Sequence, residues 1–540
     1  MNLKVWCAAL ICGVSVSAIC AADLPFDKIV NAASHPQEWL TYWGDYHATH
    51  YRDLNQINDS NVGQLRLQWI FQTGVPGAFE TVPLVFGGVM YFTANNTSAY
   101  AVDARSGREL WRFKYTIPKD ARPCCGTLNR GLAMLGGRLF MATPDAHLVA
   151  IDSRNGRLLW DTEIIPAKGI YGASMAPLAI KDKVVVGVSG GEKGNRGLID
   201  AYDAATGKRA WRFWSIPAKG EPGNETWGGD SWKQGGGPTW MTGTYDAELN
   251  TVYWGVGNPG PDLYGDVRPG DNLYSDSVVA LDGDTGTLKW HFQFTPHDVY
   301  DWDATETPML LDLPWNGKPR KLLVQANRNA FFYVLDRVTG EFLMAKPFAT
   351  QTWAKKIDNK GRPVKNPGVE PSAEGTRVCP QSAGATNWMA PSYSPDTGLF
   401  YFNVREGCDI YYSSPPVYEE GKGYWGSIFR GETGERQWGR VTAMDPLTAE
   451  TKWTYKLYQA PWAGTLATSG NLLFAGDEDG YLMAFNAKTG ELLWKINTGN
   501  RLATSPITFE IDGKQYITMP SGSALLAFAL PDDVIAGKKK

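Results

Sequence analysis

The chain has 540 residues, a formal net charge of −4, and 59 Gly, 33 Pro and 22 Trp. Its length alone would allow about three or four domains. So much Gly, Pro and Trp favours instead many short strands joined by tight turns. Many small sheets of such strands can belong to one all-β domain. The charge balance excludes a basic nucleic-acid-binding surface, and the basic run at 538–540 is expected to be a solvated tail.

The N-terminus has the pattern of a secretory signal. Lys4 is followed by a short apolar stretch and then by small residues up to Ala22, the usual order of charged start, apolar core and cleavage region. The apolar stretch is too short to cross a bilayer comfortably. We therefore expect residues 1–22 to be removed by cleavage near Ala21 or Ala22, leaving a periplasmic chain without a transmembrane segment. A lipid anchor on Cys20 is the alternative, although the residue before it fits poorly.

Cysteine usage is consistent with export. Removal of the signal leaves Cys124, Cys125, Cys379 and Cys408. An even number in an oxidising compartment suggests two disulfides, and we expect Cys379–Cys408 together with a bond between the neighbours Cys124 and Cys125. Two buried thiols at 124 and 125 are the alternative. The sequence contains no Cys-x-x-Cys-His, so covalent c-type haem is not expected in this chain.

A short motif recurs along the chain. It has Ala or Val at the start, Asp or Asn two residues later, usually Gly at the seventh position, and usually Trp at the end. Its copies are 101–111, 150–160, 201–211, 280–290, 334–344, 443–453 and 484–494, with a degenerate first copy that ends at Trp69. The acidic or amide side chain can bond its own local backbone and Gly supplies a positive φ. The motif therefore predicts a strand, a tight turn and a second strand whose Trp packs between neighbouring sheets.

The final positions of the copies predict an all-β, eight-bladed β-propeller. These positions are Trp69, Trp111, Trp160, Trp211, Trp290, Met344, Trp453 and Trp494. Two spacings are long, from Trp211 to Trp290 and from Met344 to Trp453, and insertions there are expected to form cap loops on one face. Residues 23–540 are thus expected to be a single domain. The repeat by itself says nothing about catalysis.

The neighbouring cysteines in segment 122–130 carry the first chemical signal. A bond between adjacent cysteines lies outside ordinary disulfide geometry and would make a rigid, flat platform for a planar ligand. Here the sequence resembles the methanol/ethanol dehydrogenases that depend on pyrroloquinoline quinone (PQQ), in which such a disulfide stacks on the quinone. The resemblance covers almost the whole mature chain. It implies eight blades, and Cys379–Cys408 is similar to the family's second disulfide.

The resemblance also implies a set of cofactor contacts. Besides Cys124 and Cys125, the matching positions are Glu80, Arg130, Ser174, Ser189, Trp240, Arg328, Asn387 and Trp462. Arg130 resembles an arginine that pairs with a PQQ carboxylate, Trp240 the indole opposite the disulfide, and Arg328 the cation near the reactive oxygens. Blade packing or a surface ion pair would explain any one of these residues, but the whole set in family order is harder to explain that way. No Trp follows Trp494, which puts a further aromatic contact in doubt.

Four oxygen-bearing residues resemble the family's metal site, namely Glu192, Asn258, Asp301 and Asp303. Such hard donors suit a hard cation. By resemblance the first three hold an ion beside PQQ, and Asp301 is also the catalytic base. Asp301 and Asp303 are two residues apart, so on an extended segment they would face the same side. Asp298 is in the same motif, but the resemblance places catalysis on Asp301.

Asp303 determines which metal is expected. Calcium-dependent members of the family usually have a small or neutral residue there, whereas lanthanide-dependent members resemble this chain in having an aspartate. Three carboxylates match a trivalent ion, while with Ca²⁺ one of two close carboxylates would tend to keep a proton. We therefore expect one lanthanide(III) ion. Ca²⁺ is the alternative, which would apply if Asp303 were a solvated loop carboxylate.

Together these features imply a PQQ-dependent alcohol dehydrogenase of class EC 1.1.2.-. By resemblance, the metal polarises the quinone as a Lewis acid, Asp301 takes the hydroxyl proton, and hydride passes to the cofactor. The expected substrate is a short primary alcohol, oxidised to its aldehyde, and the expected electron acceptor is a soluble cytochrome c. One alternative is a quinoprotein for sugars or polymeric alcohols. The other is a non-enzymatic propeller scaffold, which would leave the paired cysteines and the metal set unexplained.

Overall fold

The computed structural model describes residues 23–77, 79–119, 121, 126–166, 169–432, 434 and 436–537. The predicted signal at 1–22, the neighbouring cysteines and the tail at 538–540 lie outside these residues. Strands dominate the described part. The helical elements are α1 (Phe26–Val30), α2 (Asp532–Ile535), and the 3-10 turns η1 (Ala32–Ser34), η2 (Val62–Gln64), η3 (Asn95–Thr97), η4 (Gly191–Lys193), η5 (Asn224–Thr226) and η6 (Ser231–Gln234). None of the described helices has the length and hydropathy that a bilayer crossing requires.

Within the described residues, eight sheets of four or five strands follow one another in chain order. The first four are β3 (Leu84–Phe86), β4 (Val89–Ala94), β5 (Ser98–Asp103) and β6 (Glu109–Lys114); β7 (Ala133–Leu135), β8 (Arg138–Ala142), β9 (His147–Asp152) and β10 (Leu158–Glu163); β11 (Leu178–Ile180), β12 (Lys183–Gly187), β13 (Leu198–Asp203) and β14 (Arg209–Trp214); and β15 (Thr244–Asp246), β16 (Thr251–Gly255), β17 (Ser277–Asp282) and β18 (Leu288–Gln293).

The remaining four sheets complete the series. They are β19 (Met309–Trp315), β20 (Lys318–Ala326), β21 (Phe331–Asp336) and β22 (Phe342–Pro347); β26 (Ser392–Ser394), β27 (Leu399–Glu406), β30 (Trp438–Asp445) and β31 (Glu450–Leu457); β32 (Thr465–Thr468), β33 (Leu472–Gly476), β34 (Tyr481–Asn486) and β35 (Leu492–Asn497), with β1 (Tyr51–Arg52) as a parallel edge; and β36 (Ile507–Ile511), β37 (Lys514–Ser521), β38 (Ala524–Ala529) and β2 (Arg66–Gln72).

The long segment between Met344 and Trp453 contains extra strands, as an insertion there predicts. They form a two-stranded sheet, β23 (Ala354–Ile357) with β24 (Pro363–Lys365), and a three-stranded sheet of β25 (Thr376–Val378), β28 (Asp409–Tyr411) and β29 (Phe429–Gly431). Both are separate from the eight larger sheets.

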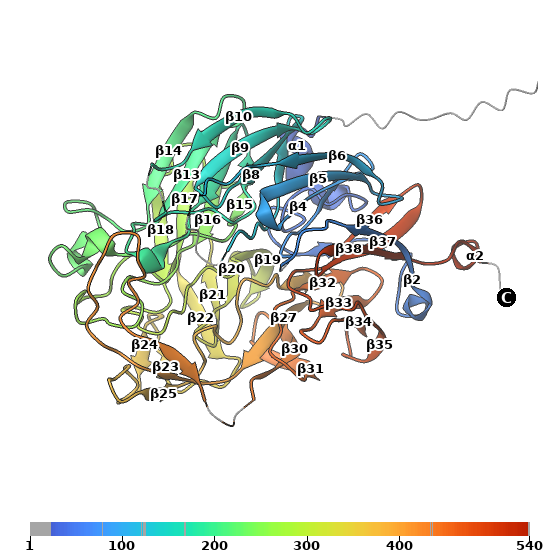
Figure 1. Cartoon of the computed structure of the whole chain (residues 1–540). Coiled ribbons are helices and arrows are strands. Elements are labelled where there is room, and N and C mark those ends of the chain that lie inside the picture. Colours follow the sequence, from blue (N-terminus) through green and yellow to red (C-terminus); the bar gives the residue numbers. More distant parts are fainter. Residues whose placement is uncertain are drawn as a thin grey trace, which may run out of the picture.

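β2, a strand from the N-terminal part of the chain, completes the last sheet. Figure 1 shows the sheets following one another round the molecule from blue through green and yellow to red, and both views place β2 beside β38. The two strands pair antiparallel, with Trp69 opposite Ala527. The last sheet is thus built from both ends of the chain. The prediction of an all-β chain is confirmed.

Burial falls off from the inside of each sheet to its outer strand. In the first sheet every residue of β4 is buried, whereas the outer strand β6 has only alternate residues partly buried. A strand that is buried on both faces reads as a continuous apolar run, and an edge strand alternates. The outer strand of each sheet is the one that carries the final position of a repeat.

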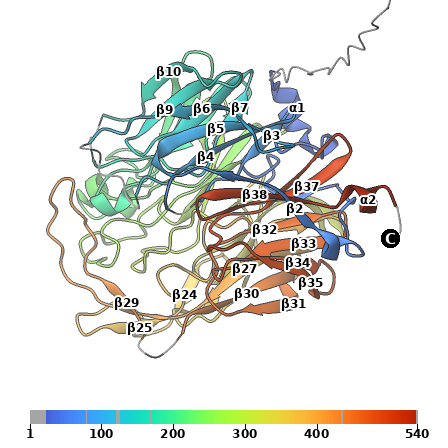
Figure 2. The same cartoon turned by 45° about the vertical axis from the view of Figure 1, so that its right-hand side comes forward.

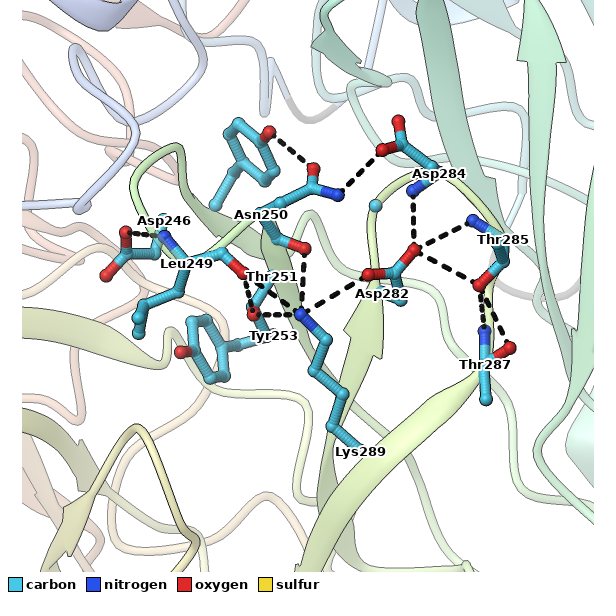
Figure 3. Close-up of polar contacts among 12 residues, drawn as sticks. Asp246, Leu249, Asn250, Thr251, Tyr253, Asp282, Asp284, Thr285, Thr287 and Lys289 are labelled. Carbon is cyan, nitrogen blue, oxygen red and sulfur yellow. Dashed lines mark hydrogen bonds and ion pairs between the residues drawn. The ribbon is translucent and has the colours of Figure 1, made fainter.

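The repeat forms the turn that its residues predict. In the copy at 280–290, Asp282 Oδ1 accepts hydrogen bonds from the main-chain N of Asp284 and Thr285, both at 3.1 Å (Figure 3). Lys289 Nζ lies 3.4 Å from the other oxygen of Asp282. Gly286 follows with φ +70°, a conformation that glycine adopts without a side-chain clash. The aspartate and the glycine of the motif are therefore turn residues.

The repeat tryptophans join neighbouring sheets. The indole Nε1 of Trp111 donates to Ser153 O in the next sheet at 3.0 Å, and a Cβ on Gly156 would lie only 2.6 Å from the Trp111 ring. The same pair of contacts recurs at five further copies, whose donors are Trp69, Trp160, Trp211, Trp290 and Trp453. The interpretation of the tryptophan as a wedge between sheets is confirmed, and the ring explains why the facing turn needs a glycine.

The copy without tryptophan faces a turn that has no glycine. Met344 occupies the indole position, and the following copy has Ala449 where the others have glycine. Both side chains pack against one core cluster. A flexible thioether leaves room for a methyl group that a flat indole would exclude, so the two departures from the motif compensate each other.

Candidate functional site

A cavity of about 450 Å³ gathers the residues that the sequence singled out. Every predicted cofactor or metal residue within the described part of the chain lines it. These residues are Glu80, Arg130, Ser174, Ser189, Glu192, Trp240, Asn258, Asp301, Asp303, Arg328, Asn387 and Trp462. Cys124 and Cys125 lie outside the described residues.

The topology explains why residues so far apart in sequence meet. Each lies shortly before the first strand of a sheet or after its second strand: Glu80 precedes β3, Ser189 follows β12, and Arg328 follows β20. Neighbouring strands are antiparallel, so the start of the first strand and the end of the second lie at the same end of the sheet's strands. Successive sheets therefore present their site residues at equivalent strand ends.

A larger cavity, of about 710 Å³, lies elsewhere and carries many charges. Two of its basic groups are paired with acidic ones: Arg337 Nε donates to Asp246 at 2.8 Å, and Lys321 Nζ lies 2.8 Å from Glu248. It contains none of the predicted site residues. Carboxylates whose pKa is raised are the better sign of function, and Glu192, Asp262 and Asp301 in the smaller cavity are of that kind.

Glu80, Arg130 and Ser174 form one polar group in the cavity. Arg130 lies 2.9 Å from the Glu80 carboxylate and donates to Ser174 Oγ at 2.7 Å. Burial raises the pKa of the Glu80 carboxyl, and the positive charges of Arg130 and Arg501 oppose that shift. The Nε of Arg130 has no hydrogen-bond partner among the described residues. The guanidinium thus keeps a donor available for a further acceptor such as a carboxylate.

Two guanidinium groups lie close to the Trp240 ring. The Arg130 guanidinium is 4.8 Å and that of Arg328 5.8 Å from its ring centroid, within the range of cation–π attraction. Its Nε1 donates to Asp303 Oδ2 at 2.9 Å. The indole is therefore held both at its nitrogen and over its ring, which leaves a defined aromatic surface in the cavity.

Ser189 and Glu192 come from a single turn after β12. The main-chain N of Ser189 donates to Gly172 O at 2.7 Å, and Glu192 follows in η4. Burial raises the pKa of the Glu192 carboxyl, with a smaller contribution of the same sign from Asp303. The turn thus brings a hydroxyl and a perturbed carboxylate into the cavity together.

Asp303 is buried and fully engaged. Its Oδ1 accepts from the main-chain N of Asn258 at 3.0 Å, and its Oδ2 lies 3.1 Å from Arg328 as well as accepting from Trp240. A Cβ at Gly257 would be 1.9 Å from Asp303 Oδ1, so this approach requires glycine. The alternative of a solvated loop carboxylate at Asp303 is wrong.

Asp301 lines the same cavity as Asp303. The alternation of side chains along an extended strand does not explain this. The φ of Asp301 is +63°, in the left-handed region, so the expectation of an extended segment is wrong. Asp298 stabilises this turn: its Oδ2 accepts from the main-chain N of Tyr300 at 3.3 Å and of Trp302 at 3.1 Å. Asp298 does not line the cavity, which agrees with the choice of Asp301 over Asp298.

Buried carboxylates repel one another in this part of the cavity. Burial and then the Asp303 carboxylate raise the pKa of Asp301 well above its usual range. Burial and then the Asp301 carboxylate do the same for Asp262. Among the described residues, no three His, Cys, Asp or Glu side chains converge closely enough to hold a metal ion. The cluster therefore has an excess of negative charge without a preformed cage.

Arg328, Asn387 and Trp462 complete the predicted set. Arg328 donates to the main-chain oxygen of Asp301 at 2.9 Å and to Asn387 Oδ1 at 3.2 Å. The guanidinium of Arg405 lies 4.0 Å from the centroid of Trp462. The buried Arg328 thus links the Asp301 turn to the Asn387 segment.

One of the two predicted disulfides lies within the described residues. Cys379 is bonded to Cys408, which confirms that pairing. The bond joins residues next to the paired strands β25 and β28, where Val378 is opposite Asp409. It stabilises the inserted three-stranded sheet.

The cavity also contains residues that the sequence did not single out. They are Leu128, Gly190, Pro238, Asp262, Trp388, Trp425, Arg501 and Ala503. Only Asp262 offered a signal, as an acidic residue four positions after Asn258 in the same Gly/Pro-rich segment. The others are of types that occur throughout the chain.

Trp425 lines the cavity. It belongs to the loop that leads into β29, a strand labelled at the lower left of Figure 2. The loop is attached to two site segments through its main chain. Tyr424 N donates to Glu192 O at 2.6 Å, and Leu263 N donates to Trp425 O at 2.8 Å. An insertion remote in sequence thus supplies an aromatic lining residue.

Comparisons with known proteins agree with this geometry. The chain matches the PQQ family described as glucose/ethanol/alcohol dehydrogenase, beta-propeller domain, over residues 39–346 and 422–517. It is 38% identical over 524 residues to the quinoprotein alcohol dehydrogenase PedH of Pseudomonas putida, covering 92% of this chain and 88% of that protein. It is 36% identical over 551 residues to the lanthanide-dependent methanol dehydrogenase of Methylacidiphilum fumariolicum, covering 95% and 90% respectively.

Solved structures give the same result. A europium-containing methanol dehydrogenase has a TM-score of 0.89 at 33% identity, covering 93% of this chain and 100% of that one. The quinohemoprotein alcohol dehydrogenase of Comamonas testosteroni has a TM-score of 0.89 at 34% identity, covering 96% and 83%. With these relatives similar along nearly its whole length and its predicted site residues gathered in one cavity, the chain belongs to the family of PQQ-dependent alcohol dehydrogenases.

Proposed function

We propose that this chain is a periplasmic enzyme that oxidises a short primary alcohol to its aldehyde, with bound PQQ, one metal ion and a soluble cytochrome c as electron acceptor. One observation carries the proposal: a single cavity contains both a guanidinium-flanked indole and a group of buried carboxylates. The first suits a planar, anionic cofactor and the second a hard cation.

The residues present fit PQQ. Arg130 and the hydroxyls of Ser174 and Ser189 would hold its carboxylates, and the unpaired Nε of Arg130 is a donor suited to that role. Trp240 would lie against one face of its rings. Arg328 and Asn387 would contact the quinone oxygens, with Glu80 and Trp462 at the rim of the cofactor.

The residues also fit a cation, provided that their carboxylates move closer together when the ion binds. Glu192, Asn258, Asp301 and Asp303 offer hard oxygen donors in one cavity, and their excess negative charge would be neutralised by an ion. Because the carboxylates do not converge among the described residues, a bound ion would have to draw them together. PQQ would supply a two-electron acceptor and the metal a Lewis acid.

The protein's own part in the reaction is to position the alcohol and to move one proton. Asp301 would accept the hydroxyl proton of the alcohol on its carboxylate as a general base. Arg328 holds the main-chain oxygen of Asp301, which keeps that carboxylate in place during the transfer. Trp425 would exclude water from the reacting end of the cavity.

The architecture proposed for this enzyme is an eight-bladed propeller with cap loops. Eight sheets, each with one repeat end position on its outer strand, support the blade count. The loop that carries Trp425 supports a cap over the cavity. The exported location rests on the signal pattern at 1–22.

We expect Cys124 and Cys125 to be bonded to each other in the active protein. The even number of cysteines after removal of the signal and the Cys379–Cys408 bond leave these two as partners. Peptide mapping without reduction should recover them in one oxidised peptide. Free thiols at both positions, or a bond from Cys124 to Cys379, would contradict the expectation.

The whole proposal is tested by reconstitution. Purified apo-protein, supplied with PQQ and either La³⁺ or Ca²⁺, should reduce an artificial dye when a short primary alcohol is added. Omission of PQQ should abolish the signal. No dye reduction with any member of a series of alcohols, sugars and polymeric alcohols would reject the proposed activity, and a preference for sugars would correct the substrate class.

A further inference from the structure

Asp262 is a buried carboxylate that no predicted role uses. It lines the cavity and is only 2% exposed. Its Oδ1 accepts no hydrogen bond from any described residue. A buried ionised oxygen without a partner costs several kcal/mol, so such an atom facing a cavity indicates a missing partner.

The residues on either side of Asp262 are held through their main-chain atoms. Arg268 donates to Pro261 O through Nε at 3.3 Å and through Nη2 at 3.0 Å. On the other side Leu263 N donates to Trp425 O at 2.8 Å. Arg268 also donates to Asp298 O at 2.5 Å, which ties the Asp262 segment to the turn before Asp301. Asp262 is therefore fixed relative to the candidate catalytic turn.

The part of the cavity around Asp262 has more carboxylates than cations among the described residues. The carboxylates in this part of the cavity are Glu192, Asp262, Asp301 and Asp303. Arg328 neutralises one of them, Asp303, at 3.1 Å. Its other carboxylate neighbour, Glu306, lies 3.4 Å from Arg328 Nε and does not line the cavity. Three net negative charges remain when the four cavity carboxylates are ionised.

We propose that Asp262 is a further ligand of the metal ion. Three residues separate it from Asn258 in the sequence. The proposal rests on the proposed function only in that both concern the same ion. Three net negative charges and an unpartnered carboxylate oxygen match a hard trivalent cation. Both oxygens of Asp303, in contrast, already accept from Asn258, Trp240 or Arg328.

The test is metal affinity, read without turnover. Metal-stripped full-length protein is titrated with Tb³⁺, and tryptophan-sensitised Tb³⁺ emission is followed, since Trp240 and Trp425 line the same cavity. Asp262→Asn should weaken Tb³⁺ binding at least about tenfold, because a charged ligand becomes neutral. Asp266→Asn removes the same charge from an exposed position of the same loop and should change the affinity less than about twofold.

Thermal unfolding separates a lost ligand from a damaged fold. Without metal, Asp262→Asn should be at least as stable as the wild type, because repulsion among buried carboxylates is relieved. With metal, it should gain less stability than the wild type. If the variant does not fold, Asp262→Glu, which keeps the charge, should bind Tb³⁺ more tightly than Asp262→Ser.

The failures of the two proposals are distinguishable. Wild-type affinity in Asp262→Asn, in a protein that oxidises alcohols, would overturn the role of Asp262 and leave the function intact. Reduced Tb³⁺ affinity in a protein that shows no PQQ-dependent oxidation would support the ligand and reject the function. An unchanged affinity with an altered KM for the alcohol would assign Asp262 to the substrate and overturn the inference.

Discussion

Replacing Asp301 with asparagine is expected to lower alcohol turnover by about 10²–10⁴-fold, the usual contribution of a general base. Asparagine has the size of aspartate and keeps one oxygen, but it is a far weaker base. Arg328 holds residue 301 through its main-chain oxygen, so the turn should survive the change. The loss corresponds to about 3–5 kcal/mol of transition-state free energy.

The measurement is turnover of reconstituted protein at saturating PQQ and metal, with the bound cofactor followed by its absorbance. Retained PQQ with lost turnover is the expected combination. Asp266→Asn is the matched control, since it removes one negative charge at an exposed position and should leave turnover unchanged. Activity of Asp301→Asn within a few-fold of the wild type, with PQQ bound, would remove Asp301 from the mechanism.

Turnover is expected to be high with an early lanthanide ion and much weaker with Ca²⁺. The carboxylates of Glu192, Asp301 and Asp303 face one cavity, and a trivalent ion compensates them better than a divalent one. A trivalent ion is also the stronger Lewis acid. In the metal-free site, burial and the Asp303 carboxylate raise the pKa of Asp301, and a trivalent ion would offset more of that effect than Ca²⁺.

Asp303→Ala should therefore lose lanthanide-supported activity first, and retain or gain activity with Ca²⁺. The structure adds a second consequence, because Asp303 also anchors Trp240 and Arg328. Trp240→Phe separates the two effects, because it removes the hydrogen bond to Asp303 and keeps the Asp303 carboxylate. A changed metal preference in Asp303→Ala, with an unchanged preference in Trp240→Phe, would assign the effect to charge rather than to lost anchoring.

Turnover with La³⁺ and with Ca²⁺ is compared on metal-stripped protein, because trace lanthanide would imitate calcium activity. Full Ca²⁺-supported turnover in the wild type, with no response to La³⁺, would be decisive against the prediction. Asp303 would then be an anchor for Trp240 and Arg328 in a calcium site.

Much of the fold follows from the sequence because its repeat is local chemistry. The Asp that bonds its own turn, the Gly with positive φ and the final Trp lie within eleven residues in each copy, as at 280–290. What each Trp contacts is a property of the next sheet, yet the sequence contains that information too, because its partner is the glycine of the next copy. The departures at Met344 and Ala449 are visible in the sequence, but that both residues pack against one core cluster is known only from the structure.

The sequence by itself singled out twelve of the residues that line the cavity, because chemistry-bearing residues that match a family in order need no geometry to be recognised. Only the tertiary structure decided how they are used. Burial of Asp303 against Arg328, and the left-handed Asp301 beside it, depend on contacts between segments that periodicity does not encode. Asp262 and Trp425 entered the site for the same reason. One is brought in by a turn that Arg268 holds, the other by an insertion whose main chain joins Glu192 and Leu263. A side chain in a loop becomes a site residue only when distant segments bury it there, and burial of that kind is a property of the assembled sheets.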